Sequence, residues 1–418
     1  MPFVCCTIIE GMKIMNVKYK NQLNLSLFCV IIGAFISTVI WLFLKAVSLT
    51  SSLIWEWIPG KFHLPFYTVL VCTAGGALTG ILRKRCGDYP EELTVVLGKV
   101  KNEKRYEYRN MPVMLLAAFL PLVIGSSVGP EAGLTGIIVG LCYWAGDNLK
   151  FARGNTREYS EIGMAVTLSL LFHSPLFGIF AVEEDNKEKE IPDITRTSKI
   201  FIYGLTIASG FGVYLLLSHL FGAGMEGFPS FSAQELKRAD YLMIIPYILC
   251  GCILARFYQL THHGCEGLAG KIPPVWREIT GGLCLGIAGF AVPAAMFSGE
   301  EQLDILMDTY SEYLPLLLIG MAFFKVLLTN ICILSGLKGG HFFPVIFAGV
   351  CLGYGIACLV FPDSAGHVVF AAAVVTASLL GGIMKKPLAV TMVLFLCFPV
   401  KMFVWIFLSA AIGSRSSR

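Results

Sequence analysis

An ionisable residue lies in the middle of a long apolar stretch that glycine and proline interrupt. Residues 111–145 are about 35 mostly apolar residues, enough to cross a bilayer core, and Glu131 is the one acid among them. A charge at that depth costs several kcal/mol, so such residues generally face a cavity or a pathway. Gly125, Gly129 and Pro130 lie close to Glu131 and break a helix. Irregular backbone inside a membrane must be buried in protein or line a water-filled cavity, so this stretch predicts a functional site.

The composition is that of a membrane protein. Of the 418 residues, 56% are hydrophobic and 14% are charged, whereas soluble domains carry about 25% charged residues. Spanning segments must satisfy their own backbone groups, and long apolar runs predict helices, so we expect an all-α, polytopic membrane protein. The net charge of +4 is modest and indicates no nucleic-acid partner. The 14 cysteines are scattered, many of them in apolar runs, which indicates free buried thiols.

The break before Glu131 also predicts how the site works. A helix that begins at Pro130 would point unpaired N–H groups and its positive dipole end into the cavity. A protein can bind an anion in this way without a buried lysine. The alternative is a kinked span in which Glu131 caps its own helix.

The chain divides into three parts by its charge pattern. We expect a cytoplasmic N-terminal segment at 1–24, one membrane domain at 25–412 and a short tail at 413–418. Apolar spans are predicted at 25–49, 64–82, 200–220, 241–258, 278–297, 314–334, 343–361 and 367–412, with an interfacial turn at 55–60. Basic loops at 83–109, 150–157 and 187–199 predict one cytoplasmic face. We place the protein in the cell membrane.

An internal repeat is the second strong signal. A shift of 211 residues sets Gly125 on Gly336, Gly129 on Gly340 and Glu131 on Phe342, and a shift of 212 sets Pro175-Leu176 on Pro387-Leu388. Glycine-interrupted segments at corresponding positions of two halves are typical of inverted-repeat transporters with a site at the midplane. We therefore expect repeat one at about 25–220 and repeat two at about 240–412.

Four motifs in order resemble the CLC family of chloride channels and chloride/proton antiporters. The segment 128–133 resembles that family's Gly-Arg-Glu-Gly-Pro, and 340–344 matches its Gly-x-Phe-x-Pro. The segment 172–184 resembles Phe-Asn-Ala-Pro-Leu-Ala-Gly and ends in paired acids, and 384–388 resembles a later segment of similar form. Order and spacing agree over roughly 25–412.

This resemblance implies a homodimer with one anion pathway in each subunit, built from tilted and broken helices. Glu131 takes the place of the gating glutamate, and chloride is the expected anion, exchanged for protons. The resemblance assigns anion binding to three loops: Gly87, Asp88, Tyr89 and Pro90; Gly129 and Pro130; and Gly340, His341, Phe342, Phe343 and Pro344. His341 either faces the pathway or is packed and hydrogen-bonded, and Lys338 adds positive charge nearby.

The sequence also departs from the family. The family's Gly-Ser-Gly-Ile-Pro is replaced here by Cys86-Gly87-Asp88-Tyr89-Pro90, so the serine that binds the anion is missing. An ionised Asp88 would repel an anion, unless its side chain points away from the site as a helix N-cap. The family's tyrosine before the last helix has no counterpart in 394–402, where Lys401 lies either at the pore or at an interface. The choice between chloride and another anion such as fluoride is therefore open.

The internal proton acid is ambiguous. Counting from Gly178 without a gap gives Asp185, a one-residue deletion gives Glu184, and both residues also fit a solvated loop. A passive anion channel on the same fold is the alternative to an antiporter. An intramembrane enzyme is a distant third hypothesis, because the chain shows no cluster of catalytic acids, and we expect no enzyme activity and no cofactor. We interpret His262-His263-Gly-Cys265 as a loop and predict no metal site there.

Overall fold

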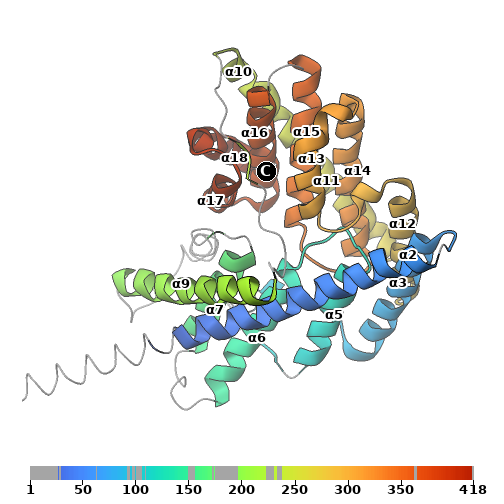
Figure 1. Cartoon of the computed structure of the whole chain (residues 1–418), viewed down its shortest axis with the longest axis vertical. Helices are drawn as coiled ribbons and strands as arrows, with labels where there is room; N and C mark the ends of the chain where they lie inside the picture. The colour runs from blue at the N-terminus through green and yellow to red at the C-terminus, as the bar shows by residue number, and fades with distance from the viewer. Residues whose placement is uncertain are drawn as a thin grey trace, which may run out of the picture.

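The chain folds into helices that are split between two halves of the molecule. The computed structural model describes residues 27, 30–62, 64–91, 95–96, 99, 106–108, 110–148, 156–171, 174, 196–222, 230–232, 238–361 and 365–416. Figure 1 shows most helices of residues 30–221 in its lower part and most of those after residue 238 above them. Within the described residues, the β-structure is a single bridge, so the predicted all-α class is confirmed.

Six continuous helices make up the described part of the first half. They are Val30–Lys61, whose end comprises a π-helical turn η1 (Leu53–Trp57) and α2 (Ile58–Lys61), then α3 (Tyr67–Cys86), α5 (Met111–Val123), α6 (Glu131–Asn148), α7 (Thr156–Leu171) and α9 (Arg196–Phe221).

The second half begins with α10 (Arg238–Leu242). It continues with α11 (Ile244–Ala269), α12 (Trp276–Ala291), η2 (Pro293–Ala295), α13 (Glu300–Thr309), η3 (Tyr310–Glu312), α14 (Pro315–Leu334), α15 (Phe342–Val360), α16 (Ala365–Met384), α17 (Pro387–Cys397), η4 (Val400–Met402) and α18 (Phe403–Ser416).

Six described helices are long and apolar enough to cross a membrane. They are Val30–Lys61, Gly204–Phe221, Ile244–Ala269, Pro315–Leu334, Phe342–Val360 and Gly366–Met384. Met111–Val123 and Glu131–Trp144 are apolar but shorter, as expected for helices that stop at a central site. The prediction of a polytopic membrane protein is confirmed.

Two local predictions were wrong. The turn expected at 55–60 continues the first helix, because Trp55 packs against Tyr67 and donates its ring N–H to the carbonyl oxygen of Val123 at 2.9 Å. The loop expected at 262–265 lies inside α11, which is 26 residues long. A short motif encodes neither a contact with a distant residue nor the length of the helix that contains it. The helix therefore continues through both motifs.

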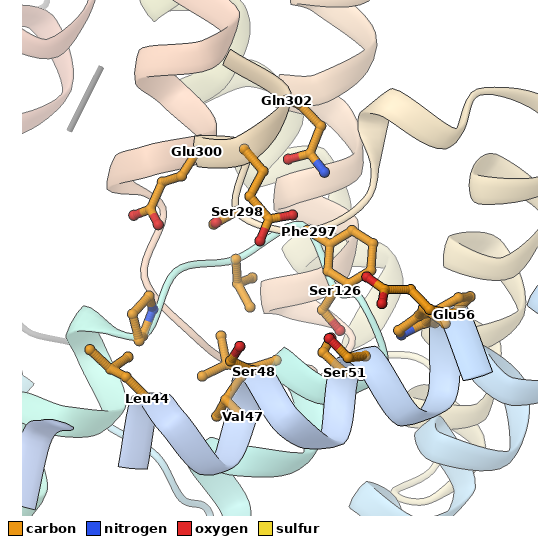
Figure 2. Close-up of a pocket in the computed structure, with 16 residues that line it drawn as sticks. Leu44, Val47, Ser48, Ser51, Glu56, Ser126, Phe297, Ser298, Glu300 and Gln302 are labelled. Atoms are coloured by element: carbon orange, nitrogen blue, oxygen red, sulfur yellow. The ribbon is translucent and has the colours of Figure 1, made fainter. Parts of the chain in front are cut away.

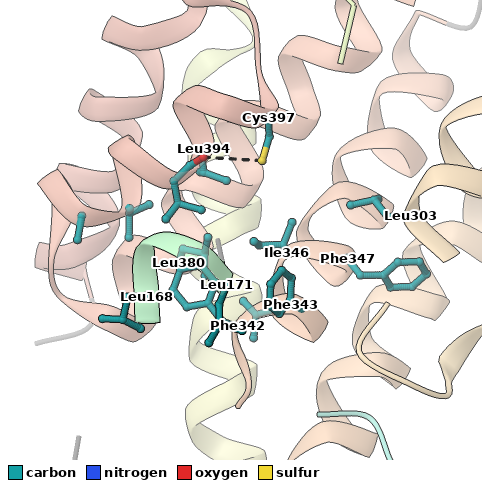
Figure 3. Close-up of a cluster of buried hydrophobic side chains, with 14 of the residues drawn as sticks. Leu168, Leu171, Leu303, Phe342, Phe343, Ile346, Phe347, Leu380, Leu394 and Cys397 are labelled. Atoms are coloured by element: carbon teal, nitrogen blue, oxygen red, sulfur yellow. Dashed lines mark hydrogen bonds between the residues drawn. The ribbon is translucent and has the colours of Figure 1, made fainter. Parts of the chain in front are cut away.

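The core lies around the start of α15. Figure 3 shows side chains from α7, α13, α15, α16 and α17 meeting there, among them Leu171, Phe342, Phe343 and Leu380. The most apolar stretch of α16 is 89% buried inside the chain, against 22% for α9, so α16 is a central helix and α9 a peripheral one. Burial of these side chains fixes the first turn of α15 inside the protein.

The two halves are also joined through α3 and α12, which pack antiparallel. Gly76 and Gly282 face each other there, and a Cβ atom added at Gly282 would lie 2.3 Å from the carbonyl oxygen of Cys72. Small residues allow two helix backbones to approach this closely in a membrane protein. This contact holds the charged end of α3 beside the start of α12.

Candidate functional site

Two irregular loops meet at the centre of the molecule. The loop before α6 and the loop before α15 form an antiparallel bridge, in which the N–H of Gly129 donates to the carbonyl oxygen of Gly340 at 2.7 Å and the N–H of Gly340 donates back at 2.8 Å. The two glycines are the pair that a 211-residue shift aligns. The bridge gives the broken backbone its hydrogen bonds and brings the starts of α6 and α15 together.

Glu131 begins α6 and reaches across to α15. Its Oε1 accepts a hydrogen bond of 2.9 Å from the backbone N–H of Phe342, the first residue of α15. Glu131 is 3% exposed, and within the part of the chain that the structure describes its Oε2 is buried without a hydrogen-bond partner. The carboxylate thus occupies the positive end of a neighbouring helix.

The carboxylate fills space that only glycine leaves open. A Cβ atom added at Gly340 would lie 1.9 Å from Cδ of Glu131, and one added at Gly129 would lie 2.0 Å from its Oε2. Any larger residue at these positions would displace the carboxylate. The glycines therefore shape a small chamber for a group the size of a carboxylate.

The remaining predicted residues of the second loop flank Phe342 at the start of α15. His341 is the N-cap residue of α15, is half-buried, and its ring packs against that of Tyr258 with centroids 5.7 Å apart. Phe343 and Pro344 are buried in the first turn of α15. Phe342 thus contributes its N–H, while its neighbours hold the turn in place.

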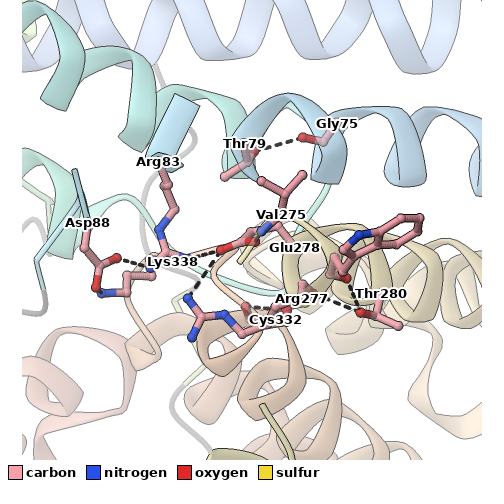
Figure 4. Close-up of polar contacts among 12 residues, drawn as sticks. Gly75, Thr79, Arg83, Asp88, Val275, Arg277, Glu278, Thr280, Cys332 and Lys338 are labelled. Atoms are coloured by element: carbon pink, nitrogen blue, oxygen red, sulfur yellow. Dashed lines mark hydrogen bonds and ion pairs between the residues drawn. The ribbon is translucent and has the colours of Figure 1, made fainter. Parts of the chain in front are cut away.

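The first loop, 87–90, adjoins both a charged network and α6. Asp88 pairs with Arg83 and with Lys338, whose Nζ lies 3.0 Å from Asp88 Oδ2 (Figure 4). Pro90 is buried, and a Cβ atom added at Gly133 in α6 would lie 3.9 Å from Pro90 Cβ. Gly87 ends α3 with a φ of +106°, and Tyr89 packs against the core.

The two cations change what Asp88 does to the local field. Burial alone would raise the pKa of the Asp88 carboxyl, but Lys338 and Arg83 lower the pKa below its usual value. Its ion pairs therefore stabilise the fold above a pH of about 4, the ordinary pKa of aspartate, and are lost as the pH falls through the lowered pKa. The side chain of Asp88 is 63% exposed, so this ion-pair network lies at the surface. The carboxylate of Asp88 largely neutralises the positive charge of Lys338.

Two predicted proton-pathway residues, Glu184 and Asp185, lie outside the described residues. Lys401 lies in η4 and is exposed. The structure therefore brings together Glu131, the glycines and Phe342, and places Asp88 in a separate network.

A match to a family model identifies the protein family of this chain. The model for the voltage-gated chloride channel family matches residues 75–418. The chain belongs to the CLC family. Its members transport anions and are not enzymes, so this CLC protein is an anion-transport protein of the membrane.

Known proteins agree with this assignment. The protein YfeO of Escherichia fergusonii is 25% identical over 358 residues, which cover 80% of this chain and 79% of YfeO. The structure resembles that of a slow cyanobacterial Cl⁻/H⁺ antiporter with a TM-score of 0.77, 19% identity and 94% of each chain covered. It also resembles a CLC-type fluoride/proton antiporter with a TM-score of 0.73, 18% identity and 96% of each chain covered. The predicted CLC-like, all-α fold is thus confirmed.

Two buried hydroxyl groups beside the site of this CLC protein were not predicted from the sequence. Ser127 and Thr329 are buried and share a hydrogen bond of 3.0 Å between the loop before α6 and α14. Within the described chain, the hydroxyl of Ser126 is buried without a partner. The sequence could have indicated these hydroxyl groups, because two adjacent serines in an interrupted apolar stretch supply hydrogen-bond donors at membrane depth.

Lys325 was also missed. It lies inside the apolar helix α14, has no exposed surface, and its Nζ donates to the carbonyl oxygens of Ala295, Met296 and Phe297 at 2.9, 3.1 and 2.8 Å. The N–H of Phe297 in turn donates to the carbonyl oxygen of Gly125 at 2.9 Å. A lone lysine in a span predicts such a buried partner set.

A cavity of about 390 Å³ adjoins the site on one side. Its lining residues include Ser126, Val128 and Pro130 from the loop before Glu131, and Figure 2 shows Glu56 and Glu300 at its two ends. Trp55, which also lines it, packs against the start of α3, whereas the Asp88 network lies at the other end of α3. A 20-residue helix is about 30 Å long, so the cavity and the network lie near opposite ends of α3.

Proposed function

We propose that this CLC protein is an anion/proton antiporter, with chloride as the expected anion. The observation that carries the proposal is the bond between Glu131 Oε1 and the N–H of Phe342. Ionised Glu131 and a small anion compete for the same positive helix end, because both seek unpaired N–H groups. Protonation removes the charge of Glu131 and frees the site, so one carboxyl group links anion occupancy to proton movement.

The electrostatic surroundings support exchange between a proton and an anion. The acidic lining of the cavity, with Glu56, Glu300 and Glu301, favours protons and disfavours anions at that entrance. On the other side, Arg83 and Lys338 counterbalance Asp88 near the loop 87–90. We assign anion binding to 87–90, 129–130 and 340–344, and an internal proton acid to Glu184 or Asp185.

The assembly and the topology belong to the same proposal. We expect a homodimer in the cell membrane, with one pathway in each subunit and the basic loops in the cytoplasm. The membrane domain is assigned to 25–412, with repeat one at about 25–220 and repeat two at about 240–412. The central bridge between Gly129 and Gly340 supports corresponding roles for the two halves.

Paired flux measurements test the function. Purified protein in liposomes is given a chloride gradient, and external chloride and pH are recorded together. Uphill proton movement driven by chloride supports the antiporter, and chloride movement without protons would replace it by a passive channel. If no chloride flux is measured but fluoride is transported, the anion is fluoride. Fluoride is the second candidate because residues 86–90 lack the serine that binds the anion in the family.

Substitution of Gly340 tests the chamber. In Gly340→Ala the new methyl group overlaps the position of the Glu131 carboxylate and of any anion that replaces it. Loss of one hydrogen bond to a charged group costs about 1.5–3 kcal/mol, so we expect anion flux to fall at least about tenfold. Gly320→Ala on α14 is the control, because a Cβ atom there has no neighbour within 4 Å. A monodisperse Gly340→Ala protein with flux within about twofold of the original would contradict the assignment.

Substitution of Asp88 tests the sign of the network. Asp88→Asn removes one negative charge and leaves Lys338 without this partner, while Arg83 keeps its ion pair with Glu278. A unit charge about 10 Å from an ion in water contributes ~0.4 kcal/mol, so we expect anion flux to rise about twofold at low ionic strength. The gain should disappear at high salt, because salt screens exposed charges. Asp308→Asn on the exposed face of α13 serves as the control, and an unchanged or lower flux in Asp88→Asn would show that Asp88 does not act on the pathway.

A further inference from the structure

Three potential metal ligands converge near the end of α11. His262, His263 and Glu266 each offer one ligand atom, and these atoms all lie within 4.8 Å of one another. His262 is half-buried, and the other two side chains are exposed. The group formed only because α11 continues through this segment, which places His262 and Glu266 four residues apart on one helix face.

The chemistry of the three groups fits a transition metal. Two imidazoles and one carboxylate are ligands that Zn²⁺ accepts, with a fourth position left for water. His263 Nδ1 already lies 3.8 Å from Glu266 Oε2, so the carboxylate faces an imidazole. The last turn of α11 ends at Ala269, and the negative end of a helix favours a cation nearby. Imidazole ligands disfavour Mg²⁺ and Ca²⁺, which prefer oxygen.

The group also contacts the central site through a row of rings. His262 packs against Tyr258 with ring centroids 6.1 Å apart, and Tyr258 packs against His341 at 5.7 Å. His341 is the N-cap of α15 and directly precedes Phe342, whose N–H binds Glu131. A metal that fixes the ring of His262 would restrict this row of rings, since a ligating imidazole has one orientation.

We propose that His262, His263 and Glu266 form a divalent transition-metal site and that its occupancy slows anion transport through the ring contacts of Tyr258 and His341. The second half of this inference rests on the proposed anion transport. The first half, metal binding, does not. The two halves therefore need separate readouts.

Binding is measured on the full-length protein in detergent, without a histidine tag. Zn²⁺ is titrated by calorimetry, and Co²⁺ reports tetrahedral coordination through its visible absorption. We expect one saturable site per chain and a loss of affinity of ~10-fold or more in both His262→Ala and Glu266→Gln, since even outer partners of metal ligands contribute 10–100-fold. His219→Ala on α9 is the control, because it removes an exposed histidine from a different helix. Absence of saturable binding, or an affinity in both ligand variants equal to that of the original protein, would overturn the site.

Transport is measured in liposomes with and without Zn²⁺ on both sides of the membrane. We expect Zn²⁺ to lower the flux of the original protein severalfold, and to have a much smaller effect on His263→Ala and Glu266→Gln, each compared with its own zinc-free flux. Zinc that binds but leaves flux unchanged would overturn the regulatory half. A protein with no anion flux at all would contradict the proposed function, and the binding titration would still decide the metal site.

Discussion

A Glu131→Gln protein is expected to lose proton movement while it still transports the anion. Glutamine has nearly the same shape, and its amide oxygen can accept the hydrogen bond from the N–H of Phe342. It cannot carry a proton at any pH in the experiment. We expect chloride-driven proton flux to fall roughly 100-fold or more, the size of effect that removal of a positioned proton-transfer group has. The measurement is the paired record of chloride and pH in liposomes.

A matched control separates this effect from a general loss of charge. Glu312→Gln changes the same side chain at an exposed position in η3 and should leave both fluxes unchanged. Proton movement that persists in Glu131→Gln at the original rate would remove Glu131 from the proton route. Loss of both fluxes together would argue against separate proton and anion roles for this site.

A Lys325→Met protein is expected to be markedly less stable. Methionine has a similar length but cannot donate to the carbonyl oxygens of residues 295–297, which are Lys325's partners. Each buried polar group that loses its partner costs about 1–3 kcal/mol. Relief from burying a charge offsets part of that cost, so we expect a net loss of about 2–4 kcal/mol.

Thermal unfolding of the purified protein in detergent checks the role of Lys325. The midpoint should fall clearly for Lys325→Met and stay nearly constant for Lys271→Met, which changes an exposed lysine between α11 and α12. Because Phe297 links Lys325 to Gly125, lower anion flux should accompany the loss of stability. Equal midpoints for both variants would mean that the buried charge costs as much as its three hydrogen bonds contribute.

Several features of the fold follow from local sequence. Apolar runs predict the positions of α9, α14 and α15 to within a few residues, because spanning helices must be long and apolar. Glycines and Pro130 predict a helix that begins at Pro130, one residue before the observed start of α6 at Glu131. Predicted helix ends were wrong where a distant residue stabilises the helix. Trp55 is the example, because its ring N–H donates a hydrogen bond to the carbonyl oxygen of Val123.

The sequence by itself determined that Glu131 had to be shielded from lipid inside the protein, because the cost of a charge in an apolar stretch is a property of the local chain. It also determined that Gly129 and Gly340 correspond. Only the tertiary structure decided the partners: Phe342 for Glu131, Arg83 and Lys338 for Asp88, and three carbonyl oxygens for Lys325. Most of these contacts join segments about 30 to 250 residues apart. Their identity depends on how whole helices pack, and no local propensity or motif carries that information.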